Sequence, residues 1–495
     1  MVFIASSKNQ TWLFPPNIKD LIPKDHICFL VDSFVEELDF TEFENRYEGA
    51  GHPAYHPRIM CKILIQSMLD RVRSARAIAR NVRENVVYIY LAEKLTPDFR
   101  TISDFRKNNT DLLKQIFKQS ITVARELGMV GLEQISIDGT ILKASASNNS
   151  AVTEKELAVI SEYIEEELKK AIDIDKEEDE RFKDLRGYDQ LNTTETKKVK
   201  HVIQKYTKQI KKDPARFAEV KSIVENAKEE LKGDTTKKIS LTDTECRFMK
   251  NKKGRIEFSY NSQIIVDHKK GIILVNDVCK SRSDYKQLIP QIENLQDNCG
   301  VLEKGMTVCA DRGYYSMKNI AFLHQKQLEP YIPPQINQEL SENKDGIPSF
   351  DISCFKYNGI KDEFICPEGK TLRYSYEIYD EKTEKGHRVY AGTQCKECES
   401  NSVCTQRKDK IRRLKKLITD TEHDQFLEKM KTDKAKEMSQ QRKQNVEPVI
   451  GNYKQNLGFR EYLTRGINTV KNEFNLVCTA VNLKKIYLFS TKIKV

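Results

Sequence analysis

Apolar residues follow two different periods along the chain, which divide it into a helical beginning, a strand-rich middle and a helical end. In residues 57–69 they recur every three or four positions after an initial proline, which predicts an amphipathic helix. β-branched segments over residues 132–142 and 255–280 predict strands instead. A His-Lys-Lys-Gly turn at residues 268–271 makes the second stretch a hairpin. From about residue 425 the pattern is helical to the end.

The order of the remaining elements extends this sheet. Residues 284–299 predict a helix, 306–310 a strand, 316–326 a second helix and 330–333 a short strand. Three strands, a helix, a fourth strand, a helix, a fifth strand and closing helices form the element order of a ribonuclease-H-like fold. We therefore expect an α/β protein with a ribonuclease-H-like catalytic domain that contains two insertions and follows an all-α DNA-binding domain.

Changes of composition set the expected domain borders. Glu, Lys and Asp dominate one insertion, where a narrow apolar stripe predicts a helical hairpin with i,i+4 ion pairs. Because the stripe is interrupted, a dimerising coiled coil is the weaker alternative. The expected domains are a helical N-terminal DNA-binding domain over 1–125, a catalytic domain from 126–150, 239–339 and 425–495, the charged helical insertion at 151–238, and a Cys-containing insertion at 340–424.

Charge and cysteine content narrow the class of protein. Lys and Arg total 83 against 73 Asp and Glu, a net charge of +10 that is compatible with a polyanionic partner without requiring one. No stretch approaches the roughly 18 apolar residues of a membrane span. Cys28, Cys61, Cys309 and Cys478 stand singly in apolar runs, as buried free thiols do. We expect a soluble protein of the reducing cytoplasm with no membrane partner.

Short helices with clustered Arg follow the first amphipathic helix. Ser74 is suited to cap one of them, and Thr101 or Ser103 another. Such helices resemble a helix-turn-helix DNA reader, although a solvated basic face fits the pattern equally well. His52 and His56 flank prolines and are interpreted as packing or capping residues, because no second ligand motif accompanies them. The candidate DNA contacts of this region are Arg76, Arg80 and Arg106.

Two aspartates, Asp138 and Asp311, stand where predicted strands end. In a ribonuclease-H-like sheet the first strand lies centrally with the fourth beside it, so these carboxylates should be neighbours. Glu447 is the best third acid from the closing helices, because Lys454 lies two helical turns further on the same face. Three carboxylates suit Mg²⁺ or Mn²⁺ ions in an in-line phosphodiester displacement. Taken alone, Asp138 with its following glycine is equally well explained by a turn.

Short motifs in a fixed order resemble the DDE transposases of bacterial insertion sequences, in the branch where a helical N-terminal domain precedes a ribonuclease-H-like catalytic domain. The matching segments are 52–57, 74–76, 97–106, 138–140, 260–263, 310–314, 446–449, 465–466 and 480–485. The resemblance runs nearly end to end. It implies that Asp138, Asp311 and Glu447 are the metal-binding triad and that Lys454 touches the transferred DNA strand.

The residues around Glu447 depart from the pattern of this family. Related transposases often carry a Tyr and an Arg at fixed positions that are occupied here by Gln440 and Lys443, with Arg442 adjacent. Arg442 and Lys443 are therefore the candidate DNA contacts of this segment. Because Pro448 disfavours helical geometry at Glu447, we expect this acid at a helix start or a kink.

Three further groups of residues have open interpretations. Glu473 is the second choice for the third acid. Arg312 and Tyr314 follow the second aspartate and either bind phosphate and stack on a base or simply pack the loop. A cysteine group with His387 nearby either holds a structural Zn²⁺ or forms a cluster of reduced thiols, since Cys-x2-Cys is a common zinc half-site but the other spacings are irregular. The thiols concerned are Cys366, Cys395, Cys398 and Cys404.

These observations predict a metal-dependent DNA transposase that nicks the ends of its element and joins the freed 3′-hydroxyl to target DNA. The expected partners are double-stranded DNA, as terminal inverted repeats and as target, and a second copy of the chain in the synaptic complex. The expected location is the nucleoid of a bacterial cytoplasm. A nuclease or resolvase on the same fold that cuts without joining is one alternative. An inactive remnant that only binds DNA is the other.

Overall fold

The structure is a computed structural model, and the chain divides into two compact units that are described separately. The first unit contains Met1–Tyr314, Lys318–Tyr331 and Ser439–Val495, and the second contains Tyr315–Met317 and Ile332–Met438. The structure describes residues 17–45, 54–148, 151–166, 191–213, 216–232, 238–251, 254–334, 350, 354–358, 361–380, 385–417 and 421–493. The Cys-containing insertion falls in the second unit, and the charged insertion falls in the first.

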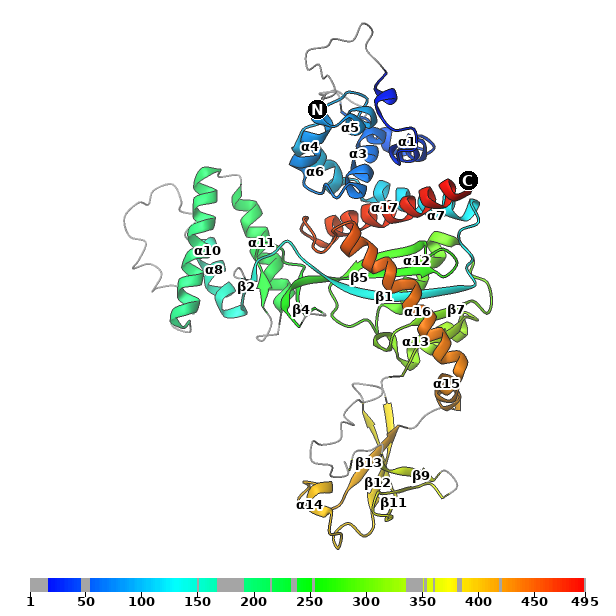
Figure 1. Cartoon of the computed structure of the whole chain (residues 1–495). Helices are drawn as coiled ribbons and strands as arrows, with labels where there is room; N and C mark the ends of the chain where they lie inside the picture. Colours follow the sequence, from blue (N-terminus) through cyan, green and yellow to red (C-terminus); the bar gives the residue numbers. More distant parts are fainter. Residues whose placement is uncertain are drawn as a thin grey trace, which may run out of the picture. The chain divides into compact units, whose positions relative to one another are not determined.

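A mixed sheet forms the middle of the first unit (Figure 1). Its strands are β1 (Gln134–Lys143), β4 (Arg247–Lys250), β5 (Ile256–Asp267), β6 (Ile273–Cys279), β7 (Thr307–Ala310) and β8 (Glu329–Tyr331). β5 pairs antiparallel with β1 on one side and with β4 and β6 on the other, whereas β1, β7 and β8 are parallel. The order β6-β5-β1-β7-β8 confirms the predicted hairpin and the central first strand with the fourth predicted strand, β7, beside it.

The two aspartates differ in their position on the strands. Asp311 follows directly after β7, as predicted. Asp138 instead lies inside β1, which continues to Lys143 in antiparallel pairing with β5. The prediction that this strand ends on its aspartate is therefore wrong. Gly139 continues the ladder opposite Gln263, so the Asp-Gly pair makes no turn here.

One long C-terminal helix, α17 (Ile467–Ile493), connects the sheet with the helices that precede it. It packs against α3 (Pro57–Leu69), α7 (Thr110–Glu126) and β6. Asn482 of α17 exchanges two hydrogen bonds of 2.9 Å with the backbone of Ile273 on β6 and donates to Oγ of Ser120 on α7 at 3.1 Å. α12 (Leu288–Cys299) packs on β5 and β6, and α13 (Met317–Gln325) precedes β8.

The N-terminal region is helical, as the sequence predicts. Its other elements are η1 (Ile18–Leu21), α1 (Cys28–Glu36), α2 (Thr41–Glu44), α4 (Ala75–Glu84), α5 (Val86–Leu91) and α6 (Phe99–Asn108). Nδ1 of His56 accepts the N–H of Arg58 at the start of α3, which confirms the capping interpretation. His52 lies outside the described residues.

Two predicted helix caps of this region differ from the structure. Asp98 caps α6 by accepting the N–H of Thr101 at 2.7 Å, so the prediction of Thr101 or Ser103 as the cap is wrong. Asp98 is the better N-cap because it directly precedes the helix and its carboxylate accepts the N–H of the third helical residue. Ser74 does precede α4, but its side chain makes no capping hydrogen bond.

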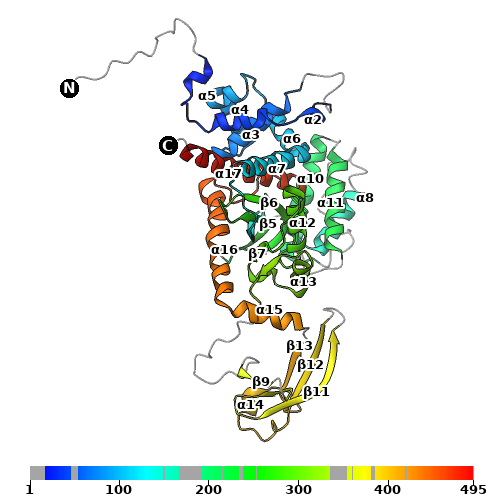
Figure 2. The same ribbon diagram turned by 90° about the vertical axis from the view of Figure 1, so that its right-hand side faces the viewer.

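The charged insertion has a hydrophobic core of its own. It contains α8 (Glu154–Glu166), α10 (Thr193–Lys212) and α11 (Arg216–Leu231), which lie side by side in Figures 1 and 2. Leu157, Ile203 and Val224 are among the buried residues that the helices share. β2 (Ala151–Val152) pairs with β3 (Ile239–Ser240) where the insertion begins and ends. The described part of the insertion therefore contains three helices where a helical hairpin was predicted. Its apolar residues are buried between these helices.

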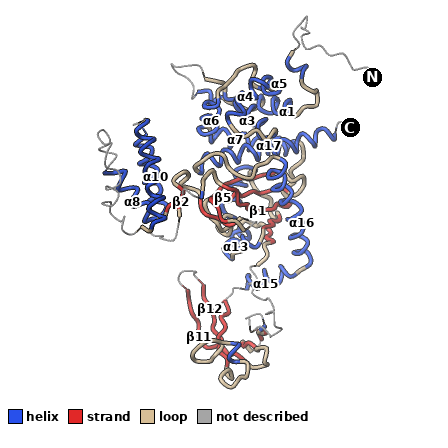
Figure 3. The backbone as a smooth tube through the Cα atoms, turned by 60° about the vertical axis from the view of Figure 1, so that its left-hand side comes forward, coloured by secondary structure: helices blue, strands red, loops and turns tan. Residues whose placement is uncertain are grey.

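The second unit is built on an antiparallel sheet of order β13-β12-β11-β10-β9, whose long hairpin of β11 and β12 is visible in Figure 3. The strands are β9 (Lys356–Asn358), β10 (Glu363–Ile365), β11 (Thr371–Asp380), β12 (Lys385–Gly392) and β13 (Arg413–Leu417). Two helices, α14 (Asn401–Cys404) and α15 (Thr421–Lys431), accompany them.

The helix that carries Glu447 is continuous through a proline. α16 runs over Asp433–Gly451 with Pro448 inside it, so of the two predicted positions for Glu447, a helix start or a kink, the helix start is wrong. The fixed φ of proline suits a helix, and the loss of a single hydrogen bond does not end α16. A π-helical turn, η8 (Asn452–Asn456), follows directly and carries Lys454. Residues 457–466 then interrupt the predicted helical end, and Glu461 forms a β-bridge with Lys143 of β1.

Candidate active site

Asp138 and Asp311 occupy neighbouring backbone positions in the sheet. The last parallel pair between β1 and β7 joins the residues immediately before them. The Asp138 side chain is only 8% exposed, and its Oδ1 accepts the N–H of Gly139 at 2.9 Å. Oδ1 of Asp311 accepts the N–H of Gly313 at 2.8 Å. Two acids that are far apart in sequence are thus brought together on rigid strands, as the strand order requires.

Arg442 lies between Asp138 and Glu447. Its Nη1 is 3.4 Å from Oδ2 of Asp138, and its Nη2 is 4.0 Å from Oε1 of Glu447. The Arg442 side chain is 9% exposed, whereas that of Glu447 is 54% exposed. Nη1 is buried and makes no hydrogen bond. A single guanidinium therefore faces two of the three predicted acids without being fully satisfied by either.

Lys454 approaches the same strand from the π-helical turn. Its Nζ donates to Oγ1 of Thr140, which lies two residues beyond Asp138 and hence on the same face of β1. α16 and η8 together bring one acid, Glu447, and two cations, Arg442 and Lys454, to the face of β1 that carries Asp138.

A fourth carboxylate, Asp284, completes the cluster and was not expected from the sequence. Its Oδ1 accepts from Nδ2 of Asn261 at 2.6 Å and from Nε2 of Gln263 at 2.7 Å, both on β5. Burial raises the pKa of Asp284, the two amide donors lower it, and the nearby Asp311 raises it again. A Ser-Asp pair before a helix has the pattern of an N-terminal cap, so nothing in the local sequence distinguishes Asp284 from a capping residue.

Two glycines provide the space in which these acids meet. A Cβ built on Gly139 would lie 2.9 Å from Oδ1 of Asp284. A Cβ built on Gly313 would lie 2.9 Å from Oδ1 of Asp311 and 3.4 Å from Oδ2 of Asp284. Asp284 and Asp311 therefore face the same small space, and a side chain at Gly313 would have to displace one of them.

The residues beside Asp311 and Glu447 divide into exposed and buried groups. Arg312 and Lys443 are exposed, which leaves them accessible to DNA. Tyr314 is fully buried, and its hydroxyl donates to Oε1 of Gln263, so the predicted stacking on a base is wrong and the packing interpretation holds. This hydrogen bond fixes the amide that holds Asp284.

Glu473, the second choice for the third acid, is engaged elsewhere. It is fully buried on α17 and forms an ion pair of 2.7 Å with Arg73. Its Oε2 accepts the N–H groups of Leu463 at 3.0 Å and Thr464 at 3.1 Å. These partners occupy the carboxylate, so Glu473 is a structural residue and Glu447 is kept as the candidate.

The predicted DNA contacts of the N-terminal helices also separate by burial. Arg76 and Arg80 are exposed on α4, and the Arg76 guanidinium lies 5.0 Å from the centroid of the Phe99 ring. Arg106 is 5% exposed and donates to the backbone carbonyl of Arg73 at 3.2 Å. The structure contradicts a DNA contact by Arg106, because its guanidinium points into the protein, where burial lowers its pKa.

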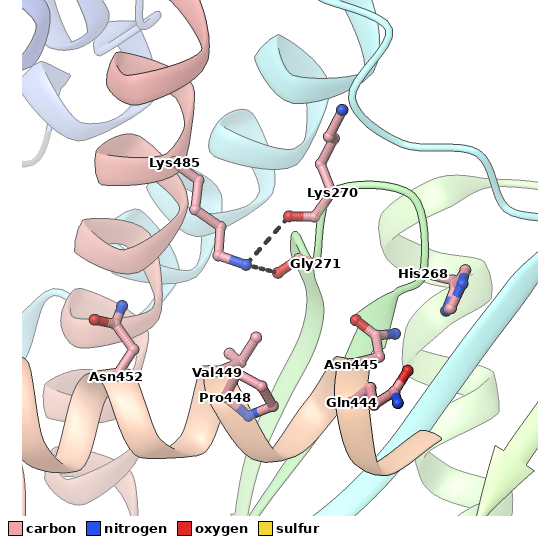
Figure 4. A pocket seen from close by; sticks show the side chains of 9 residues that line it. All are labelled: His268, Lys270, Gly271, Gln444, Asn445, Pro448, Val449, Asn452 and Lys485. Carbon is pink, nitrogen blue, oxygen red and sulfur yellow. Dashed lines mark hydrogen bonds between the residues drawn. The ribbon is translucent and has the colours of Figure 1, made fainter. Parts of the chain in front are cut away.

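A pocket of about 380 Å³ lies along a different flank of α16 (Figure 4). Its lining residues are His268, Lys270, Gly271, Gln444, Asn445, Pro448, Val449, Asn452 and Lys485. Nζ of Lys485 donates to the carbonyl oxygens of Gly271 at 2.6 Å and Lys270 at 3.2 Å. Burial lowers the pKa of Lys485 to about 8. None of the predicted acids lines this pocket, so it is separate from the acid cluster.

The carboxylates are of the type that binds a divalent cation, although in the structure they do not surround a common point. Within the described ranges, no three His, Cys, Asp or Glu side chains surround a single point at metal-ligand distances. A cation, the Arg442 guanidinium, nevertheless lies between Asp138 and Glu447 with a buried Nη1 that has no hydrogen bond. Carboxylate oxygens held around a positive charge are the donors that Mg²⁺ and Mn²⁺ prefer.

A central β1 with β7 beside it and an acid on each strand is the arrangement expected of a ribonuclease-H-like fold. Comparison with known families agrees: residues 365–487 match the family described as transposase DDE domain, and residues 16–108 match the transposase domain DUF772. The chain is a transposase with a DDE domain and an N-terminal DUF772 transposase domain, which confirms the resemblance. Glu447 lies within the DDE match, whereas Asp138 and Asp311 lie between the two matched ranges.

A search of curated proteins gives no match. In the part of the chain that the structure describes, no helix combines the length and the apolar character needed to cross a membrane. The DDE domain implies a family of phosphoryl-transfer enzymes that bind DNA and use divalent metal ions.

Proposed function

We propose that this transposase cuts DNA at the ends of its element in a metal-dependent reaction and joins the freed 3′-hydroxyl to target DNA. The observation that carries the proposal is the register of β1 and β7, which makes Asp138 and Asp311 neighbours. Glu447, which lies across Arg442 from Asp138, supplies the third acid. The DDE match, which includes Glu447, supports this assignment.

The proposed architecture assigns one role to each region. A ribonuclease-H-like catalytic domain carries the acids and is interrupted by the charged and the Cys-containing insertions. An all-α DNA-binding domain precedes it and recognises the terminal inverted repeats. Two copies of the chain bring two ends together in a synaptic complex on the DNA of a bacterial cytoplasm.

In the proposed reaction, Asp138, Asp311 and Glu447 hold Mg²⁺ or Mn²⁺. When bound, the ions supply activation of the attacking oxygen and stabilisation of the leaving oxygen in an in-line displacement. A water and then a DNA 3′-hydroxyl attack in turn, so no side chain forms a covalent bond to DNA. The strands and α16 hold the carboxylates, which limits the reorganisation needed in the transition state.

Basic residues on two regions would hold the DNA. Arg442 and Lys454 supply positive charge beside Asp138, and the exposed Arg312 and Lys443 extend it outward. Arg76 and Arg80 of α4 are the proposed contacts of the N-terminal domain. Because such contacts release counterions, we expect binding of element-end DNA to weaken steeply as salt increases.

The test is cleavage and joining of a labelled element-end duplex in Mg²⁺ or Mn²⁺. Asp138→Asn, Asp311→Asn and Glu447→Gln should each abolish both steps while leaving DNA binding intact. Glu437→Gln is the matched control, because Glu437 is an exposed acid on the same helix as Glu447. Activity that survives Glu447→Gln would show that the third acid has been misassigned.

The same assay separates the alternatives. A nuclease or resolvase would yield cleaved ends and no joined product. A DNA-binding remnant would bind element ends in the wild type without metal-dependent cutting, and Asp138→Asn would bind them equally well. Either result would reject strand transfer as the function of this chain.

A further inference from the structure

The sheet of the second unit has a small apolar core. In the described part of this unit, one cluster of buried hydrophobic side chains lies against the sheet: Phe355, Phe364, Leu372, Tyr390 and Leu414. The outer parts of β11 are open to solvent, with Tyr376 45% exposed and Tyr379 66% exposed. So small a core rarely stabilises a sheet by itself, and small folds of this kind usually contain disulfides or a metal ion.

Four free thiols are neighbours beside this core. Cys366 and Cys404 both pack against the buried cluster. The two segments that carry the thiols are in contact, because Oγ of Ser400, in the stretch that holds Cys395, Cys398 and Cys404, donates to Oε1 of Glu368, in the turn that holds Cys366, at 2.8 Å. Each of the four thiols is half-buried. The chain thus brings together thiols from two segments, the turn after β10 and the stretch after β12.

The first thiol lies in a tight turn that points a backbone N–H at its sulfur. The N–H of Cys366 donates to the carbonyl of Lys370 at 2.8 Å, and Gly369 donates back to the carbonyl of Cys366 at 2.9 Å. The N–H of Lys370 then donates to Sγ of Cys366 at 3.2 Å. Gly369 has a φ of +73°, which favours glycine at this position. The turn therefore holds the sulfur of Cys366 in one position at the edge of the core.

The other three thiols follow β12 within a short stretch. Cys398 donates its N–H to the carbonyl of Cys395 at 3.2 Å, and the Asn401 side chain donates to the same carbonyl at 2.6 Å. Cys404 ends α14. A Cβ on Gly392 would lie 2.1 Å from Sγ of Cys395, so the close approach of this sulfur requires a glycine.

We propose that Cys366, Cys395, Cys398 and Cys404 bind one structural Zn²⁺ that ties together the loops at one end of this sheet. Four cysteine ligands that include a Cys-x2-Cys pair form a common tetrahedral zinc site. Among the residues that the structure describes, no three ligands already surround one point, so zinc binding would require the sulfurs to move closer together. This site is independent of the acid cluster and of DNA cleavage.

The surroundings of the thiols fit this assignment. Arg412 donates to the carbonyl of Cys404 at 2.9 Å and brings a positive charge to a site that four thiolates would make strongly negative. His387, which the sequence placed near the thiols, lies on β12 opposite Ile378 and Leu417 and is separated from Gly392 by four further residues of the strand. The ligand set is therefore four thiols without this histidine.

The test is the zinc content of the full-length chain purified under reducing conditions, measured by elemental mass spectrometry. We expect one equivalent in the wild type and less than about 0.2 equivalents in Cys398→Ser. Cys354→Ser is the matched control and should keep its zinc, because Cys354 is another free, half-buried thiol that packs against the same core.

A second measurement on the wild type keeps the proposal testable if Cys398→Ser fails to fold. A thiol-specific mercurial should release one zinc per chain, and cobalt exchanged into the site should give the visible absorption of a tetrahedral cobalt thiolate. Less than about 0.2 equivalents of zinc in the wild type, iron in place of zinc, or an equal loss in Cys354→Ser would each overturn the assignment. None of these results depends on whether the chain cuts DNA.

Discussion

Nη1 of Arg442 lies 3.4 Å from Oδ2 of Asp138 and has no hydrogen-bond partner. A buried donor that is left unpaired is costly, and its position between Asp138 and Glu447 is where the proposed reaction needs both metal and phosphate. We infer that Arg442 balances the charge of these acids before metal and DNA bind. A phosphate oxygen would then satisfy the unpaired N–H.

This relationship predicts opposite effects of Arg442→Met on metal binding and on cleavage. Loss of a unit charge about 4 Å from the acids should strengthen binding of Mn²⁺ in the absence of DNA by roughly tenfold or more. Cleavage should fall because a phosphate contact is lost. Calorimetric titration with Mn²⁺ measures the first effect, and Lys443→Met, a change to an exposed neighbour, should leave it unaltered. Weaker Mn²⁺ binding in Arg442→Met would contradict the inference.

Asp284 should act through its neighbour Asp311 as a positioning residue. Asp284→Asn keeps the size of the side chain but removes a negative charge that faces Asp311 across Gly313. We expect the Mg²⁺ concentration for half-maximal cleavage to rise several-fold, with element-end DNA bound as before. Asp297→Asn, a change to an exposed acid on α12, is the control. If the Mg²⁺ concentration for half-maximal cleavage does not change, Asp284 has only a packing role.

The two glutamates near the C-terminus should fail in different ways when changed to glutamine. Glu473→Gln removes a fully buried charge and leaves Arg73, whose side chain is only 10% exposed, without its ionic partner, which should cost about 3–5 kcal/mol of unfolding free energy. Glu447→Gln changes an exposed acid and should leave the melting temperature nearly constant while cleavage is lost. Thermal denaturation and the cleavage assay, run on both variants, would show whether stability and catalysis separate in this way.

Lys485 should make stability depend on pH above neutrality. Its pKa is lowered from 10.5 to about 8 in the folded chain, so between these values the unfolded chain binds more protons and stability rises with pH. The full rise is on the order of 3 kcal/mol. Urea denaturation at pH 7.5 and 9.5 should show the gain in the wild type and in Lys484→Met. A gain of equal size in Lys485→Met would exclude Lys485 as its source.

Strand pairing was the part of the fold that the sequence predicted best. β-branched runs and a four-residue turn were sufficient for the β5–β6 hairpin, and the order of elements then required β7 beside β1. The neighbouring positions of Asp138 and Asp311 follow from that order. Local patterns were less reliable where two interpretations share one signal, as with the Asp-Gly pair at Asp138, which continues a strand instead of turning.

Side-chain burial was the part that the sequence could not supply. Arg106 and Arg76 look alike in sequence, yet Arg106 is buried on α6, which packs against the distant α17, and Asn472 of α17 donates to its backbone carbonyl at 3.0 Å. In the sequence, Asp284 resembles a helix cap; in the structure, Asn261 and Gln263 of β5 donate hydrogen bonds to its carboxylate. Both cases depend on tertiary contacts between distant segments, which no local periodicity records.

The short pair of β2 and β3 has a consequence for how this chain can be altered. Ala151 pairs with Ser240 and Val152 with Ile239, so the polypeptide leaves and re-enters the rest of the unit at points about 5 Å apart. The helices between them share a core of their own. The segment is therefore a cassette that another domain could occupy, provided that Arg247 and Lys280, which form ion pairs with Glu230 of α11, receive another acidic partner.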